Sequence, residues 1–211
     1  MRRMVNRRRR REWQTFFGNN RRLFLFVGLF LAGAVVGVAA YHGFAGNAEL
    51  DRLLLTHGVT AGWREALREW VSACFSTAVW LAVLFLLGLW PCGVPFVLAV
   101  PLIYGAGFGL TEACYYSGGW RGVLAVVAVI LPSGLLHAAV LMMAGAESLR
   151  LSVRLTRQLL PVSAREPAGS TSTVLWPLFR LYCLRYLIFL AVGAAAGLAE
   201  VLLRTMFARL L

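Results

Sequence analysis

The sequence predicts an all-α polytopic membrane protein, a five-helix transmembrane bundle with short loops, a surface helix before span two and a basic amphipathic helix after span four. Hydrophobic residues make up 60% of the 211 residues, and the mean hydropathy is +0.72. Only 14% are charged, whereas soluble domains contain about 25%. Residues 70–111 contain no Asp, Glu, Lys or Arg. Since one spanning helix needs roughly 20 apolar residues, this stretch is long enough for two spans.

The uncharged stretch predicts a transmembrane hairpin with spans over residues 70–90 and 96–116. Between them, residues 91–95 carry two prolines and a glycine, which end a helix and start a turn. Trp90 closes the first span, where an amphipathic ring suits the headgroup level. A soluble hairpin would need a polar face on each helix, and these segments have none.

The chain before the hairpin divides into a tail, a first span and a polar segment. Residues 1–22 form an arginine-rich cytoplasmic tail with nine Arg and one Glu, and the spans occupy residues 23–211. The apolar residues 23–44 exceed the about 7–15 residues of a signal-peptide core, so we expect an uncleaved span one. Residues 47–69 are polar, and their second half places Trp63, Leu67 and Trp70 on one helical face. We expect this half to lie on the membrane surface and to run into span two.

The chain after the hairpin predicts two more spans. Span four covers residues 122–146 and contains Pro132, which predicts a kink. Arg150, Arg154 and Arg157 then share one helical stripe, which predicts an amphipathic helix resting on lipid headgroups. Residues 161–173 have the composition of a loop, and residues 184–203 form span five.

The distribution of arginine predicts the orientation. All 21 basic residues are Arg, and with the N-terminus inside, 15 of them lie in inner segments and six in outer segments. Cytoplasmic segments of membrane proteins are enriched in such residues. We therefore expect a multi-pass protein of the bacterial cell membrane with a cytoplasmic N-terminus and an external C-terminus. The net charge of +12 then reflects orientation and contact with anionic lipid rather than nucleic-acid binding.

Three spans carry a GxxxG motif, which removes side chains from one helical stripe and lets two backbones approach closely. The pattern suits tight packing either inside the bundle or against a partner's helix, and we favour packing inside the bundle. The six expected helix-packing glycines are Gly33, Gly37, Gly105, Gly109, Gly193 and Gly197.

Few polar residues lie within the spans, and these are the default candidates for function. His137 follows Ser133 by four residues, which places both on one face. Intramembrane serine proteases generally place this pair on different helices, so we expect Ser133 to bond a local carbonyl and His137 to be satisfied inside the bundle. Glu200 precedes Arg204 by one turn, and Glu112 lies at a similar depth. Two carboxylates at one level would suit a proton or a cation.

The motifs of several enzyme and cofactor classes are missing from the sequence. It contains no HExxH, no phosphate-binding Walker loop, no dinucleotide fingerprint and no CxxC pair among its four cysteines. His42 and His57 lack metal-ligand spacing. We therefore expect no catalytic residues, no metal and no cofactor.

The chain resembles the stage II sporulation protein M family. The basic N-terminus, the five spans and the proline-containing hairpin turn carry the resemblance, together with residues 131–152 (LPSGLLHAAVLMMAGAESLRLS) and 196–203 (AGLAEVLL). Glu200 stands at the place of a recurrent acidic residue. Many relatives have His after the proline and Glu four residues later, whereas this chain has Ser133 and His137.

The resemblance implies a non-enzymatic scaffold. Such a protein sits in the septal membrane during engulfment in endospore formers and anchors two peptidoglycan-degrading partners, sporulation proteins D and P. The alternative is a transporter or permease component that uses Glu112, His137 and Glu200. Because a cell-wall hydrolase acts outside the membrane, we expect its docking site on the face formed by Trp63, Leu67 and Trp70. The other interpretation of this face is contact with lipid.

Overall fold

The computed structural model describes residues 2–44, 63–159 and 171–210, and these residues form helices and no strands. Five segments of the described chain are long and apolar enough to cross a membrane, which confirms the predicted fold class. The helices are α1 (Arg2–Phe44), α3 (Trp63–Leu89), α4 (Val94–Ser117), α5 (Trp120–Ala125), the π-helical segment η1 (Val126–Ile130), α6 (Leu131–Leu159) and α7 (Thr171–Leu210). The candidate spans are Arg21–Gly43, Trp63–Leu89, Val94–Ser117, Gly122–Thr156 and Trp176–Met206.

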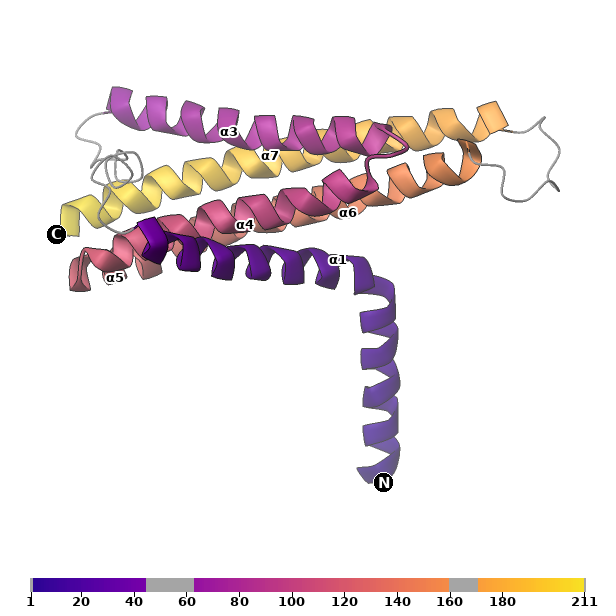
Figure 1. Cartoon of the computed structure of the whole chain (residues 1–211), viewed down its shortest axis with the longest axis horizontal. Coiled ribbons are helices and arrows are strands. Elements are labelled where there is room, and N and C mark those ends of the chain that lie inside the picture. The colour runs from indigo at the N-terminus through magenta and orange to yellow at the C-terminus, as the bar shows by residue number, and fades with distance from the viewer. Residues whose placement is uncertain (1, 45–62, 160–170, 211) are drawn as a thin grey trace.

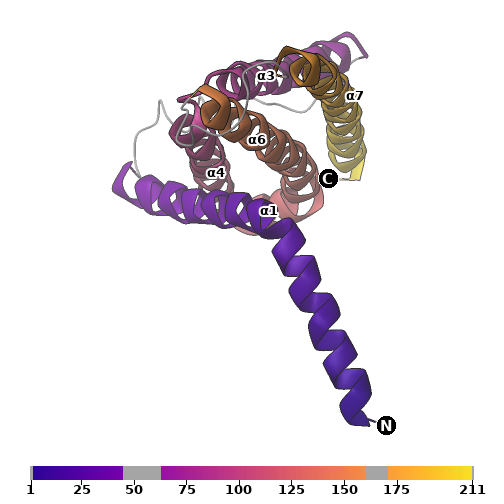
Figure 2. The ribbon, with the colours of Figure 1, turned by 90° about the vertical axis from the view of Figure 1, so that its right-hand side faces the viewer.

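The spans pack as an elongated bundle, and the first part of α1 projects from it at a steep angle (Figures 1 and 2). At one end of the bundle, α3 and α6 finish while α4 and α7 begin; we call this the turn end. At the other end, α3 begins and α7 finishes; we call this the Trp63 end. The segments that connect successive spans therefore lie alternately at the two ends of the bundle, in the order in which the sequence predicts inner and outer segments.

Helices α1 and α4 contact each other backbone to backbone. A Cβ atom added at Gly33 would overlap the carbonyl oxygen of Leu102, and one added at Gly105 would overlap that of Phe30. Gly37 and Gly109 meet Ala106 and Ala34 in the same way. Without side chains along these two stripes, the helices approach more closely than any other residue type would permit.

The third glycine pair lies between α7 and α3. A Cβ atom added at Gly193 would come within 2.8 Å of Thr77 Cγ2, and one added at Gly197 would lie 3.5 Å from Ala73 Cβ. All six glycines of the GxxxG motifs therefore lie at contacts between helices of this chain.

The turn between α3 and α4 is held by hydroxyl groups of α6. Ser152 Oγ donates a hydrogen bond to the carbonyl oxygen of Trp90 at 2.8 Å. Thr156 Oγ1 donates to the carbonyl oxygen of Pro91 at 2.5 Å. The end of a helix leaves its last carbonyls without intrahelical partners, so α6 supplies donors that the turn itself lacks.

The two amphipathic helices expected beside the spans are each continuous with a neighbouring span. Helix α3 starts at Trp63, so the predicted surface helix and span two form one continuous helix. The basic segment after residue 149 is likewise the last part of α6. Leu151 and Ser152 are buried there, whereas Arg150 and Arg154 are exposed. The apolar side of this segment therefore packs on the bundle, and its arginines face outward. The part of the predicted outer loop before Trp63 lies outside the described residues.

Helix α7 is much longer than the predicted span five. Its apolar segment covers Trp176–Met206 rather than residues 184–203. Two arginines, Arg180 and Arg185, interrupt the hydropathy of its first half. The structure pairs Arg185 with Glu147 of α6, which explains how a charged residue is tolerated inside this span.

Candidate functional site

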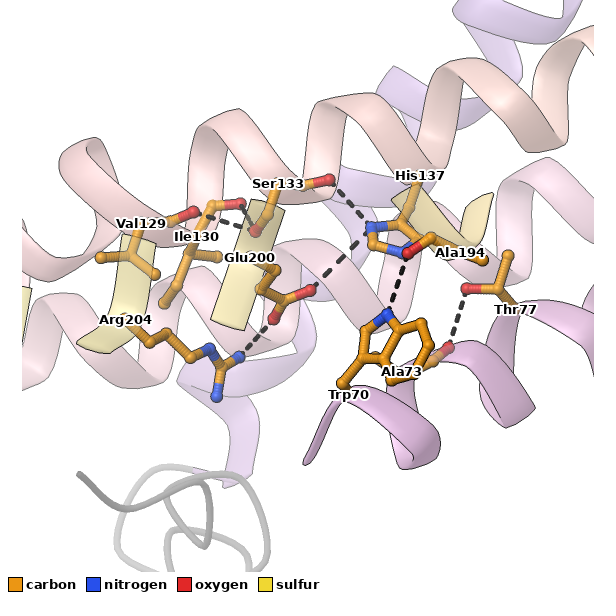
Figure 3. Close-up of polar contacts among 10 residues, drawn as sticks. All are labelled: Trp70, Ala73, Thr77, Val129, Ile130, Ser133, His137, Ala194, Glu200 and Arg204. Atoms are coloured by element: carbon orange, nitrogen blue, oxygen red, sulfur yellow. Dashed lines mark hydrogen bonds and ion pairs between the residues drawn. The ribbon is translucent and has the colours of Figure 1, made fainter. Parts of the chain in front are cut away.

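A polar cluster connects α3, α6 and α7 inside the bundle toward the Trp63 end (Figure 3). We call it the His137–Glu200 cluster. Its members are Trp70, Thr77, Ser133, His137, Glu200 and Arg204.

Helix α6 contributes Ser133 and His137, which are 2% and 6% exposed. Ser133 Oγ donates a hydrogen bond to the carbonyl oxygen of Val129 at 2.9 Å. His137 Nδ1 lies 3.0 Å from the carbonyl oxygen of Ser133, not against its hydroxyl. The hydroxyl proton is therefore directed at the backbone and not at an imidazole base, so these two residues do not form a nucleophile–base pair.

The same bond of Ser133 explains the helix around Pro132. Proline has no N–H, so it cannot satisfy a carbonyl in the preceding turn. The chain adopts the π-helical segment η1 just before it, and Ser133 Oγ approaches two carbonyls of that segment, those of Val129 and Ile130. A π-bulge is one of the usual ways in which a helix accommodates such a defect.

Helix α7 contributes the charged pair of the cluster. Glu200 Oε1 accepts a hydrogen bond from Arg204 Nη2 at 2.5 Å, and Glu200 Oε2 lies 3.9 Å from His137 Nδ1. Glu200 therefore links α7 to α6, and the pairing with Arg204 occurs at the spacing expected from the sequence. Glu112 makes no hydrogen bond or ion pair with the cluster among the described residues.

A second carboxylate reaches the cluster from α3 instead. Glu69 lines a cavity of about 370 Å³ together with His137, Glu200 and Arg204. Its Oε2 atom is buried and has no hydrogen-bond partner in the described part of the chain. Glu69 was not among the candidate residues predicted from the sequence. Its spacing of eight residues, or about two turns, before Thr77 was the signal that it faces the bundle.

The cavity is polar but does not assemble a metal site. Ser72, Ser76 and Tyr104 also line it, and a neighbouring cavity of about 440 Å³ extends past His137 toward Thr111 and Tyr115. Among the described residues, no group of three or more His, Cys, Asp or Glu side chains is arranged to hold a metal ion. The cavity brings together two carboxylates, an imidazole and a guanidinium, all of which can form hydrogen bonds.

The three residues of the predicted docking face do not share one surface. Trp63 is 73% and Leu67 is 49% exposed. Trp70 turns inward, because its indole Nε1 donates to the carbonyl oxygen of Ala194 on α7 at 3.0 Å (Figure 3). The exposed face continues instead through Val71 and Phe75 at four-residue spacing. We call Trp63, Leu67, Val71 and Phe75 the α3 strip.

A second polar cluster, toward the turn end, was missed by sequence reasoning. Ser148 is fully buried, donates to the carbonyl oxygen of Leu84 and contacts the hydroxyls of Tyr182 and Tyr186. The hydroxyl of Tyr182 fits because residue 88 is glycine, whose added Cβ would collide with it. The spacing of Tyr182 and Tyr186 by one turn was the available signal. These contacts join α3, α6 and α7.

Comparison with known proteins gives one match. The family model for stage II sporulation protein M matches residues 23–201, which begin at the start of the first span and end within the last. No curated protein and no solved structure matches the chain. The matched region contains the α3 strip, the second polar cluster and every member of the His137–Glu200 cluster except Arg204.

Proposed function

Because the chain belongs to the stage II sporulation protein M family, we propose that it is a non-enzymatic membrane scaffold that anchors peptidoglycan-degrading proteins at the septal membrane during engulfment. Sporulation proteins D and P are the expected partners. The docking site is proposed from the α3 strip, which is the Trp63 end of an exposed apolar face that continues along α3 through Val79, Val83 and Leu86.

The proposed orientation places the Trp63 end of this strip toward the outer face of the membrane, on the side where a cell-wall hydrolase acts. The arginine distribution supports a cytoplasmic N-terminus, with 15 arginines in inner segments and six in outer segments. In the structure, the start of span one, the α3–α4 turn and the end of α6 lie at the turn end. The Trp63 end is then external.

The strip lies on a helix that contacts α7 through Trp70, which favours its use as a docking surface. Behind it, the Trp70 indole donates to a backbone carbonyl of α7, and the Trp70 ring lies 3.6 Å from the position of a Cβ at Gly197. The exposed side chains therefore project from a fixed helix, so binding a partner requires little ordering of the scaffold. Aromatic residues are also enriched among the strongest contributors to interfaces.

Trp63→Ala tests the docking site. We expect it to reduce co-purification of the partner by more than about tenfold, because truncating an interface hot spot typically costs about 2 kcal/mol or more. Trp176→Ala is the matched control, since Trp176 is 71% exposed but lies on α7 toward the turn end. The measurement is the amount of partner recovered per scaffold at equal membrane insertion. Unchanged recovery with Trp63→Ala would show that the strip faces lipid and that docking occurs elsewhere.

The polar cavity supports a second candidate function, proton-coupled transport. Glu69, His137 and Glu200 line one cavity within the bundle, and intramembrane ionisable groups commonly mark proton or substrate pathways. Glu200→Gln separates the two functions, with Glu112→Gln as the control outside the cluster. If the protein is a scaffold, Glu200→Gln should retain sporulation and partner binding. If it is a proton-coupled transporter, Glu200→Gln should lose transport while Glu112→Gln retains it.

A further inference from the structure

A basic groove opens at the turn end between α1, α6 and α7, on the end of the molecule that faces the viewer in Figure 2. Its volume is about 870 Å³. Five arginines and one glutamate line it, together with apolar residues from all three helices. It is separate from the His137–Glu200 cluster and from the α3 strip.

The charges of the groove are only partly balanced. Glu147 accepts hydrogen bonds from Arg150 at 2.6 Å and from Arg185, so one carboxylate serves two guanidinium groups. Arg21, Arg22 and Arg154 form no salt bridge within the part of the chain that the structure describes. A guanidinium carries five N–H donors in a planar fork that matches a phosphate, so both the paired and the unpaired arginines retain donors for an anion.

The walls of the groove are apolar beside these charges. Leu25 of α1 and Leu178 and Leu181 of α7 line it along with the arginines. The lining residues from 178 to 185 extend about 10 Å along α7, since a helix rises 1.5 Å per residue. A small soluble anion would contact the arginines but leave the leucine walls uncovered.

We propose that this groove binds an anionic phospholipid, with the headgroup phosphate on the arginines and an acyl chain along the leucines. Arg21 and Arg22 stand at the start of span one, where the headgroup layer begins. Basic pockets between spanning helices are suited to anionic headgroups. A lipid in this groove would contact α1 and α7 as well as α6, since all three helices line it. The proposal is independent of which proteins dock at the Trp63 end.

Three probes distinguish a lipid from a soluble phosphate. The purified full-length protein is placed in detergent with phosphatidylglycerol, with phosphatidylcholine or with sn-glycerol 1-phosphate, and bound molecules are counted by native mass spectrometry. We expect retention of phosphatidylglycerol and little retention of the other two. Phosphatidylcholine has the acyl chains without the net negative charge, and glycerol phosphate has the anion without the chains.

Two variants locate the site. Arg22→Gln combined with Arg154→Gln removes two charges that form no salt bridge in the described part of the chain, and should weaken phosphatidylglycerol binding by about 25-fold, at about fivefold per arginine. Arg180→Gln is the matched control, because Arg180 is exposed on α7 within the same turns but does not line the groove. Thermal unfolding in detergent without lipid checks that each variant is folded.

Three outcomes would overturn the proposal. In the first, the double variant retains as much phosphatidylglycerol as the wild type. In the second, Arg180→Gln loses as much phosphatidylglycerol binding as the double variant, which shows that binding depends only on the total charge. Alternatively, glycerol phosphate binds as well as phosphatidylglycerol, which assigns the groove to a soluble phosphate. A double variant that is folded and has lost phosphatidylglycerol, while Arg180→Gln retains it, supports the lipid site.

Discussion

At the scale of single residues, hydrogen bonds show that two residues on the same helical face can have different roles. Ser133 and His137 share a helical face, yet each bonds to backbone oxygen, and His137 reaches Glu200 on another helix. A hydroxyl within a helix commonly bonds a carbonyl one turn earlier. That local bond is the reason why the spacing of a Ser–His pair does not produce a catalytic pair here.

Ser133→Ala should therefore preserve function. It removes one hydrogen bond to the carbonyl of Val129, so we expect a loss of stability of about 1 kcal/mol and near-normal complementation of a strain that lacks the gene. Sporulation efficiency is measured at matched protein levels. Complete loss of function with a normal amount of protein would revive a catalytic role for the hydroxyl.

At the scale of helices, glycine stripes decide how closely two spans pack. On α1, Gly33 and Gly37 meet the backbone of α4, whereas Gly28 has open space beside it. On α4, Gly105 and Gly109 meet α1, whereas Gly107 has open space. Lipid chains are as apolar as the helices, so close packing and not hydrophobicity drives their association.

Gly33→Ala should destabilise the bundle, since the added methyl collides with the carbonyl of Leu102 and a backbone atom cannot move as a side-chain end can. We expect a loss of about 1–3 kcal/mol, measured as the free energy of unfolding in detergent micelles.

Gly28→Ala is the control on the same helix. Nothing lies within 4 Å of its added methyl, and alanine favours a helix over glycine by up to about 1 kcal/mol. The control should be neutral or slightly stabilising. If both variants behave alike, the α1–α4 contact is looser than the structure indicates.

At the scale of the whole molecule, the two ends differ in what they present. The turn end carries the basic groove and the capped α3–α4 turn. The Trp63 end carries the α3 strip and lies closer to the His137–Glu200 cluster. A scaffold with a cytoplasmic N-terminus would therefore hold lipid from the inner leaflet and bind partners on the outer side.

Labelling of cysteines tests this orientation. Cys92 is exposed in the turn between α3 and α4, so a variant that keeps Cys92 and has alanine at residues 74, 114 and 183 reports on the turn end. We expect a membrane-impermeant maleimide to leave it unlabelled in intact cells and to label it after lysis. Gly118→Cys in a cysteine-free background should be labelled in intact cells, because residue 118 is exposed at the Trp63 end. The opposite pattern would reverse the orientation and move the proposed docking face inside.

Hydropathy, together with the prolines and glycine of residues 91–95, predicted the five spans, the hairpin over residues 70–116 and the all-helical class. The reason is that a bilayer requires every spanning backbone group to bond within its own helix, so an apolar run of sufficient length has few structural options. The glycine spacing likewise marked close helix contacts, although it did not identify which helices meet.

Only the tertiary structure decided how charged and polar side chains are paired. The apolar segment of α7 begins before the predicted span and includes Arg180, and the structure places Arg185 beside Glu147. Three contacts depend on residues more than 30 positions away in the sequence. Trp70 donates to α7, Glu69 lines a cavity with His137 and Glu200, and Ser148 is buried beside two tyrosines. Periodicity identifies which face of a helix a residue occupies, but the helix that covers that face is selected by packing among all five spans.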